Sequence, residues 1–432
     1  MQNSHHYYKW EMLALLFFAY FFHQADRAIF GVVAPLIRDD LHLTETQIGL
    51  TASVLFAVMA VMVPIAGFVG DRYSRKRIIT VSILFWSLTT MLTGICRTLG
   101  SLVFFRSIAT GGSESFYGPA STAMIASYHK STRALALSIH QASLYIGVMT
   151  SGFIAGGLAE SFGWRSTFYL FGGCGILIGL VLAFRLRDPE PQEMDDRMDP
   201  GDNRRSLWSV TLILLKIPSV WLLTCGFIAI VFVNNAYLVW APGLLEEKFQ
   251  LSLTAAGGYA MFYHHLAALL FILFGGWLSD RLAQRNLSYR VYMQAAAMLL
   301  GVPLIWLLGA GSSLVFVLTI TFLLGAVRGL YESSTHAAIF ETVPEQYRAS
   351  LCGLMIMVAF LLGSTSPLLL GGLCDVYGKA DGLSLGFKYL ALAWLLGGLS
   401  VLAAALLTYP RDQKKVHQTF TVRRSPGENE NE

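Results

Sequence analysis

The feature that most constrains this chain is a succession of apolar stretches of about twenty residues or more, such as 47–69, 252–278 and 386–408. At about 1.5 Å of rise per residue, a helix of that length crosses the roughly 30 Å hydrocarbon layer of a membrane. A chain in lipid must satisfy its own backbone polar groups, so it forms either helices or a closed barrel. The stretches are too long and too uniformly apolar for barrel strands. The composition, 55% hydrophobic and 13% charged, agrees with a membrane protein.

We predict an all-α membrane protein with twelve transmembrane helices in two related six-helix bundles. The predicted helices cover residues 11–36, 47–69, 78–96, 100–127, 133–160, 165–185, 217–242, 252–278, 290–309, 313–341, 348–373 and 386–408. A polar, proline-containing stretch separates the sixth helix from the seventh. The predicted domains are therefore an N-terminal bundle at 1–186, a cytoplasmic linker at 187–206, a C-terminal bundle at 207–410 and a cytoplasmic tail at 411–432.

The distribution of Lys and Arg among the loops predicts the orientation of the chain. Basic residues are retained on the cytoplasmic side of a membrane, and most of them fall in the loops of one side. Those expected on the other side are Arg38, Arg97, Arg165, Lys248, Lys379 and Lys388. We therefore expect both termini to be cytoplasmic, in a bacterial inner membrane.

Other features of the sequence point away from several classes of protein. The five cysteines have no paired spacing, which argues against disulfides and a metal site. No phosphate-binding loop of the G-x-x-x-x-G-K-[ST] type is present, so we expect neither ATP hydrolysis nor any cofactor. The net charge of +4 is explained by the cytoplasmic loops and gives no reason to expect a nucleic-acid partner.

Two short sequences recur at the same place in each half of the chain. Leu41-His42-Leu43-Thr44 returns as Leu251-Ser252-Leu253-Thr254, an offset of 210 residues. Gly67-Phe68-Val69-Gly70-Asp71-Arg72 returns as Gly276-Trp277-Leu278-Ser279-Asp280-Arg281, an offset of 209 residues. Duplicated bundles of this kind commonly enclose a binding site near the middle of the membrane.

The second recurring sequence belongs to a longer motif, G-x-x-x-D-R-x-x-R-[KR], made here by Gly67, Asp71, Arg72, Arg75 and Lys76 with Arg77 after it. This motif resembles the loop between helices two and three of the major facilitator superfamily, and the resemblance extends over essentially the whole chain. It implies secondary transport and an inter-helix charge latch that holds the outward-open state. Asp280 and Arg281 would serve the same gating role in the second half. The plainer reading is that these cations only anchor the chain on the cytoplasmic side.

Charged residues in the first and fourth helices resemble two branches of that superfamily. Asp26-Arg27, and Arg106 followed by Glu114, are similar to the anion:cation symporters and also to the Spinster-like transporters. The family spacing between this Arg and Glu is typically seven residues, whereas it is eight here. The first branch implies symport of an organic anion with a cation, and the second implies transport of a lysolipid or another amphiphile.

Ionisable residues at the middle of a membrane cost about 2.5 to 3.5 kcal/mol each and are usually functional. Burial favours the neutral form of a carboxylate and a nearby Arg favours the charged form, so a Glu that alternately meets and leaves an Arg exchanges a proton. We predict that Glu114, assisted by Asp26, carries the proton and that Arg27 binds an anionic group of the solute, with Arg106 and Arg328 as alternates. The competing interpretation is static ion pairs that only fix helix packing.

Further candidates for solute contact lie in both halves. Arg328, Glu332 and His336 follow one another at four-residue spacing on one face of the tenth helix. Tyr20, Gln141, Asn234 and Asn235 are polar residues within apolar segments. Such residues also serve as hydrogen-bonding contacts between membrane helices, and His264-His265 is open to interpretation as a pH sensor.

The sequence thus predicts a secondary active transporter, not an enzyme, that works by alternating access. We expect proton-coupled symport of a small organic anion such as a sugar acid, with protons and membrane lipid as further partners and a monomeric chain. The alternative is a Spinster-like transporter of lysolipid or another amphiphile. A sensor that keeps the fold without transporting is disfavoured, because no sizeable soluble segment is present.

Overall fold

A computed structural model describes residues 2–70, 72–188, 216–344 and 347–415 of the chain. Within these residues the regular structure is helical throughout, which confirms the predicted class. The helices of the first half are α1 (Gln2–Leu41), α2 (Glu45–Gly70), α3 (Arg75–Thr93), α4 (Leu99–Leu102), η1 (Val103–Ala109), α5 (Thr110–Glu114), α6 (Tyr117–Tyr128), α7 (Arg133–Phe162) and α8 (Trp164–Arg185). Those of the second half are α10 (Pro218–Phe249), α11 (Leu253–Ala283), α12 (Ser288–Ala310), α13 (Leu314–Glu332), α14 (Thr335–Phe340), α15 (Arg348–Gly363), α16 (Thr365–Tyr377), α17 (Lys379–Ala403) and η4 (Ala404–Thr408).

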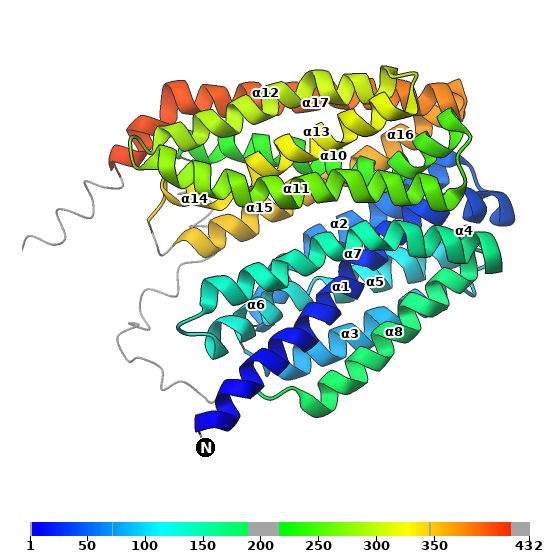
Figure 1. Cartoon of the computed structure of the whole chain (residues 1–432), viewed down its shortest axis with the longest axis horizontal. Helices are drawn as coiled ribbons and strands as arrows, with labels where there is room; N and C mark the ends of the chain where they lie inside the picture. The colour runs from blue at the N-terminus through cyan, green and yellow to red at the C-terminus, as the bar shows by residue number, and fades with distance from the viewer. Residues whose placement is uncertain (1, 71, 189–215, 345–346, 416–432) are drawn as a thin grey trace, which may run out of the picture.

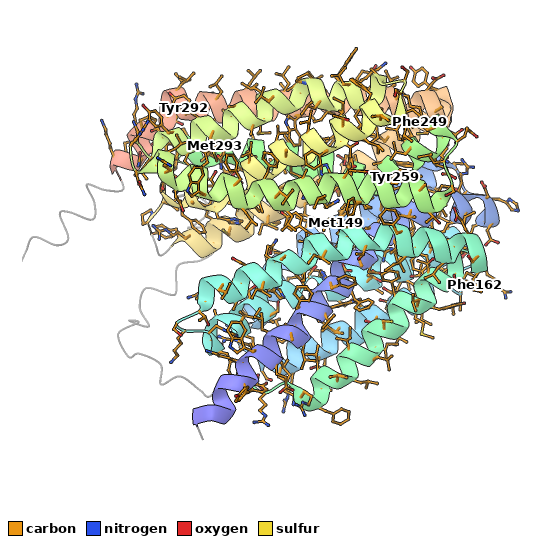
Figure 2. All side chains as sticks on the ribbon, in the orientation of Figure 1. Met149, Phe162, Phe249, Tyr259, Tyr292 and Met293 are labelled. Carbon is orange, nitrogen blue, oxygen red and sulfur yellow. The ribbon has the colours of Figure 1, made fainter. Side chains whose placement is uncertain are left out.

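Helices occupy all twelve predicted positions, and four of the membrane-length stretches are divided into shorter helical elements. Among the described residues, nine stretches are long and apolar enough to cross a membrane by themselves. The other three positions are α1, α3 and the broken stretch from α4 to α6, so the count of twelve spans stays a prediction. Large apolar side chains such as Phe162 and Tyr292 lie on the outside of the molecule (Figure 2). Phe184, Leu273 and Val315 are exposed as well. A surface of this kind fits lipid and not water.

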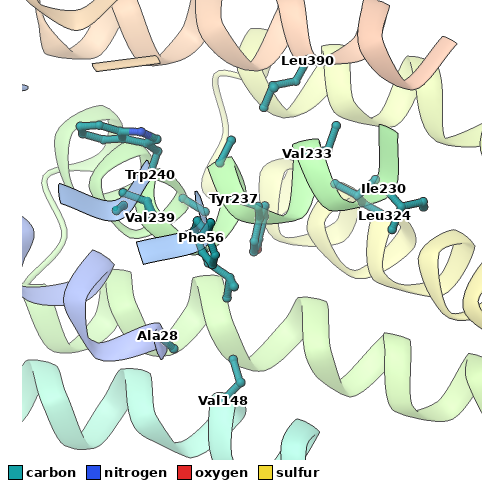
Figure 3. Packing of buried hydrophobic residues seen from close by; sticks show 14 of the residues in the cluster. Ala28, Phe56, Val148, Ile230, Val233, Tyr237, Val239, Trp240, Leu324 and Leu390 are labelled. Atoms are coloured by element: carbon teal, nitrogen blue, oxygen red, sulfur yellow. The ribbon is translucent and has the colours of Figure 1, made fainter. Parts of the chain in front are cut away.

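The helices form two bundles that lie against each other (Figure 1). The first contains α1 to α8 and the second α10 to η4, and the predicted linker falls almost entirely in residues 189–215, outside the described residues. The positions of the domain boundaries therefore stay predictions. A buried apolar cluster runs between the bundles and includes Ala28 and Val148 of the first and Tyr237 of the second (Figure 3).

The two bundles approach each other most closely at one end. A Cβ atom on Gly152 of α7 would lie 2.2 Å from the carbonyl oxygen of Gly257 on α11, and one on Gly49 of α2 would lie 2.4 Å from that of Pro367 on α16. Only glycine permits backbones to pack so closely, as in other membrane helix pairs. We call this end, where α2 and α11 begin, the capped end.

The opposite end of the bundles carries Arg72, Arg75, Arg77, Arg281 and Arg285, and we call it the basic end. There the ribbons of the two bundles diverge, and α1 begins at this end of the first bundle (Figure 1). The chain is therefore seen in a conformation that is packed together at the capped end and spread apart at the basic end.

Candidate functional site

Asp26 of α1 is joined to Arg106 of η1 in a fully buried ion pair. The Arg106 Nη1 atom lies 2.6 Å from Asp26 Oδ2, and Nη2 donates to the backbone carbonyl of Asp26 at 2.6 Å. The two side chains are only 1% and 2% exposed. Both Nη groups of Arg106 are thus occupied by the chain itself, which leaves Arg106 poorly placed as a contact for solute in this conformation.

Arg27, the neighbour of Asp26, pairs with the second predicted carboxylate. Its Nε atom lies 2.9 Å from Glu114 Oε2. The Glu114 side chain is 0% exposed, whereas that of Arg27 is 15% exposed. The second oxygen of Glu114 is buried and makes no hydrogen bond within the described residues, and the same holds for Asp26 Oδ1. Among the described residues, each carboxylate therefore keeps one unused acceptor inside the bundle, and the two Nη groups of Arg27 have no hydrogen-bond partner.

The spacing of eight residues between Arg106 and Glu114 has a structural explanation. Val103–Ala109 forms a π-helix, a local widening that accommodates an extra residue within an otherwise α-helical span. Glu114 is then the last residue of α5, and the helix is interrupted before α6 begins at Tyr117. The short helix α5 thus lies between the π-helix and the interruption, and its last residue, Glu114, reaches Arg27.

The second bundle repeats this layout with fewer charges. Arg328 of α13 donates through Nη1 to Asn234 Oδ1 of α10 at 2.5 Å, as Arg106 does to Asp26. Its Nε atom lies 2.9 Å from Glu332 Oε1 on the same helix. Glu332 is the last residue of α13, as Glu114 is of α5. Asp26-Arg27-Ala28 thus corresponds to Asn234-Asn235-Ala236, an offset of 208 residues.

One hydrogen bond joins the polar centres of the two bundles. The Tyr145 hydroxyl of α7 donates to Glu332 Oε2 of α13 at 3.1 Å. The neighbouring Met149 lies where the two bundles face each other (Figure 2). Glu332 is therefore held by its own helix through Arg328 and by the other bundle through Tyr145.

The remaining solute candidates occupy different environments. Tyr20 stacks on His140 with ring centroids 4.4 Å apart. Asn235 is buried with an unpartnered Nδ2 atom within the described residues, whereas Gln141 and His336 are exposed. The structure thus brings Arg27 together with Glu114, and Arg328 with Glu332 and Asn234, but it does not bring His336 into a polar contact with Glu332.

The gating candidates of the first bundle lie at the end of α2 and the start of α3. Gly67 is in the last turn of α2, and Asp71 lies outside the described residues. The Arg72 guanidinium stacks over the Phe68 ring at 3.5 Å, and Arg75 donates to Ser127 Oγ at 2.9 Å. The backbone N–H of Lys76 donates to Asp188 Oδ1 at 2.9 Å. These contacts remain within the first bundle.

The corresponding residues of the second bundle also contact their own bundle. Arg290 lies 3.1 Å from Asp280 and 2.6 Å from Glu341. Arg281 lies over the Trp277 ring at 5.5 Å. The predicted inter-helix charge latch stays a prediction.

Sequence reasoning missed two carboxylates at the capped end. Asp375 of α16 accepts hydrogen bonds from the backbone N–H groups of Glu45 and Thr46, both at 2.9 Å, at the start of α2. Glu160 of α7 accepts from Thr254 N at 3.0 Å and Thr254 Oγ1 at 2.5 Å, at the start of α11. Each acid thus binds the N-terminus of a helix in the other bundle, where the helix dipole favours negative charge.

A further internal repeat was available as a signal for these acids. Gly156-Gly157-Leu158 precedes Glu160, and Gly371-Gly372-Leu373 precedes Asp375, at an offset of 215 residues. Each segment ends at a glycine with positive φ, 80° at Gly163 and 84° at Gly378. The two inter-bundle bonds are therefore equivalent positions of the duplication.

No group of three or more His, Cys, Asp or Glu side chains that could hold a metal ion occurs in the described part of the chain. All five cysteines are unpaired.

Comparison with known proteins agrees with this geometry. The family model described as Major Facilitator Superfamily matches residues 16–365 and 258–426. The chain belongs to the major facilitator superfamily. It is therefore a multi-pass integral membrane protein of a class of transporters.

Relatives of this superfamily member fall in both predicted branches. It is 26% identical to protein spinster homolog 1 of Xenopus tropicalis over 431 aligned residues. This alignment covers 94% of this chain and 82% of the relative. It is 25% identical to the probable sulfoacetate transporter SauU of Cupriavidus necator, over 86% of this chain and 88% of the relative. It is also 25% identical to the hexuronate transporter of Bacillus subtilis, over 92% and 93% of the two chains.

The fold of this superfamily member is also found in a solved structure. A bacterial homologue of the human lysosomal transporter Spinster, crystallised in an inward-facing and unoccupied conformation, matches with a TM-score of 0.75 at 19% identity, over 95% of this chain and 98% of the other. At this identity the likeness concerns the fold alone.

Proposed function

We propose that this protein is a secondary active transporter that carries a small organic anion together with a proton. The observation that supports this most directly is the buried pair of Arg27 and Glu114, in which Arg27 keeps free Nη groups and Glu114 keeps a free oxygen. Relatives named for sulfoacetate and hexuronate transport support an anionic solute.

The coupling follows from competition for one guanidinium. A carboxylate or sulfonate that binds the Nη groups of Arg27 draws this cation away from Glu114. A buried carboxylate without its cation is strongly disfavoured, so Glu114 then takes up a proton. Release of the anion returns Arg27 to Glu114 and expels the proton. Anion and proton thereby move together.

The charges buried in the two bundles favour the transport of a proton together with the anion. Within the membrane, Arg27, Arg106 and Arg328 balance Asp26, Glu114 and Glu332. An anion that entered alone would leave a net negative charge in a region of low dielectric constant. A proton on Glu114 restores neutrality, while Asp26 stays charged against Arg106.

We propose that the basic end faces the cytoplasm of a bacterial cell, since basic residues are retained on that side. The conformation described above is then inward-facing. In this proposal alternating access begins when the residues around Gly67 to Lys76 close the basic end. Glu160 and Asp375 then release the N-termini of α11 and α2 at the capped end. Both termini are cytoplasmic, and the monomer is the transporting unit.

A second candidate is transport of a lysolipid or another amphiphile. The 26% identity to a spinster homologue favours it. The charges around Arg27 would then bind the head group. This alternative requires no proton on Glu114.

The test is uptake into proteoliposomes that contain the purified chain. Labelled hexuronate, sulfoacetate, muconate and lysophosphatidylcholine are each supplied with and without an inward-directed proton gradient. We expect the gradient to drive accumulation of at least one of the organic anions. Accumulation of the lysolipid alone would reject the anion in favour of the amphiphile.

The matched variants are Glu114→Gln and Glu11→Gln. Glu11 forms an exposed ion pair with Arg185 and serves as the control. We expect Glu114→Gln to lower gradient-driven accumulation by more than about tenfold, equivalent to one pH unit of drive, while exchange without a gradient continues. Unchanged gradient-driven accumulation in Glu114→Gln, with normal insertion in the membrane, would show that Glu114 does not carry the proton.

A further inference from the structure

A groove of about 580 Å³ runs along the outside of the first bundle, away from the polar centres. One wall is α3, through Arg77, Val81 and Phe85, and the other is the η1–α5 segment, through Ile108 and Gly112. The Val81, Phe85 and Ile108 side chains are 65%, 49% and 45% exposed. Since the first bundle spans the membrane, these exposed apolar side chains contact lipid, and so does the groove between them.

The length of the groove matches part of an acyl chain. Residues 77 to 85 of α3 cover about 12 Å at about 1.5 Å per residue. One leaflet accounts for about 15 Å of the roughly 30 Å hydrocarbon layer. The groove therefore runs through most of one leaflet, starting at the basic end.

Two polar side chains lie at the basic end of the groove. Tyr73, which is 67% exposed, and Arg77 line this end. Within the described residues the Arg77 guanidinium forms no ion pair, whereas nearby Arg75 is bound to Ser127 and Arg72 to the Phe68 ring. A fixed cation above an apolar channel is complementary to a lipid with an anionic head group.

The floor of the groove is open at a glycine. A Cβ atom on Gly112 would meet no other atom within 4 Å. This glycine is not required by close helix packing, in contrast to Gly111 beside it, where a Cβ would lie 2.9 Å from the Leu55 carbonyl oxygen. The space over Gly112 is therefore available to a ligand.

We propose that this groove is a binding site for an anionic phospholipid, whose phosphate meets Arg77 and Tyr73 and whose acyl chain lies between α3 and α5 over Gly112. The site is independent of the transported solute and of the proton on Glu114. It shares the η1–α5 segment with the polar centre, because Ile108 and Gly112 face lipid while Arg106 and Glu114 are buried. A lipid held there packs against the helix that positions both charged side chains.

The experiment measures lipid retained by the detergent-purified full chain, using native mass spectrometry. The probes are dioleoylphosphatidylglycerol, dioleoylphosphatidylcholine and the water-soluble glycerophosphoglycerol, which has the anionic head group without acyl chains. We expect phosphatidylglycerol to bind more tightly than phosphatidylcholine and glycerophosphoglycerol not to bind. Equal binding of the two lipids would overturn the role of Arg77.

Two variants test the two halves of the site. Arg77→Gln should weaken the binding of phosphatidylglycerol about fivefold, the effect of one cation near a lipid surface. It should weaken the binding of phosphatidylcholine less, because the choline cation already neutralises that phosphate. Gly112→Leu fills the groove and should weaken the binding of both lipids. If either variant binds as the unmodified chain does, the proposal is wrong.

Matched controls separate a site from general surface charge. Arg285→Gln removes an exposed cation at the basic end of the other bundle, and Gly173→Leu adds a side chain at a glycine of α8 with equally open surroundings. Both should retain lipid as the unmodified chain does. If Arg285→Gln loses as much bound phosphatidylglycerol as Arg77→Gln, the effect comes from the net charge of the protein and the proposed site is wrong. Thermal unfolding of every variant shows that a loss does not arise from misfolding.

Discussion

The polar centres of the two bundles share one framework but differ in charge. In both, an arginine of the fourth helix of the bundle bonds to the first helix, Arg106 to Asp26 and Arg328 to Asn234. In both, a glutamate ends a helix and pairs with an arginine, Glu114 with Arg27 and Glu332 with Arg328. The first bundle adds a second cation, Arg27, where the second bundle has the neutral Asn235.

This difference separates two tasks that a coupled transporter must perform. Two carboxylates and two cations in the first bundle form pairs that can be exchanged for a proton and an anion. The second bundle has one pair within a single helix, and amide groups replace the other charges. The duplication therefore supplied the framework twice, and we place proton coupling in the first bundle only.

The largest expected effect comes from breaking the most buried pair of the first bundle. Arg106→Gln leaves the Asp26 carboxylate buried without its cation, which should destabilise the chain by about 3–5 kcal/mol. Unfolding of the detergent-solubilised protein by a denaturing detergent measures this change. Arg328→Gln, the equivalent change in the second bundle, should cost less because Glu332 is 21% exposed.

The double variant Asp26→Asn with Arg106→Gln provides the control for that measurement. It replaces both partners with neutral groups, so most of the lost stability should return. If Arg106→Gln and Arg328→Gln destabilise equally, the two bundles do not differ in the way described here.

The second prediction concerns the pair of carboxylates at the capped end. Glu160→Gln or Asp375→Asn weakens charge-assisted hydrogen bonds of about 1.5–3 kcal/mol each to the opposite bundle. Either variant should favour opening of the capped end by about ten- to a hundredfold. Labelling of a cysteine introduced at Thr46, from the side of the capped end, measures the opening.

Because the two bonds are equivalent positions of the duplication, the two single variants should have similar effects. Asp39→Asn, which changes an exposed carboxylate that pairs within the first bundle with Arg38, serves as the control. No change in labelling for both single variants would mean that the capped end is held by backbone packing alone.

Much of the fold followed from the sequence, because long apolar stretches and loop charges determine where helices begin and end. The helix interruptions after Glu114 and Glu332 and the π-helix at Val103–Ala109 did not follow, since they depend on tertiary packing. Asp26, Arg27, Arg106 and Glu114 were recognised as candidates from their position in the membrane. Which carboxylate pairs with which arginine was not predictable, because it depends on how α1 rotates against a helix some 80 residues away.

The third prediction makes the second bundle resemble the first. Asn234→Asp places a carboxylate beside Arg328, which Glu332 already neutralises. The extra negative charge should repel an anionic solute and raise the KM for uptake about tenfold, equivalent to about 1.4 kcal/mol. The ratio of uptake with and without a proton gradient should not change.

Initial uptake rates at several anion concentrations measure both quantities. Asn234→Leu is the companion variant, since it removes the hydrogen bond to Arg328 without adding charge. A change in proton dependence with Asn234→Asp would mean that the second bundle also takes part in coupling.

The smallest expected effect belongs to the hydrogen bond between Tyr145 and Glu332, which joins the two polar centres. Tyr145→Phe removes the bond to Glu332, worth about 0.5–1.5 kcal/mol for an ordinary hydrogen bond. This bond exists in the conformation that is packed together at the capped end, so its loss should favour opening there by about two- to tenfold. The same cysteine labelling measures it. Glu332→Gln removes the charge of the acceptor and also breaks the pair with Arg328 within α13. No change in labelling for Tyr145→Phe would show that the bond to Glu332 does not hold the capped end closed.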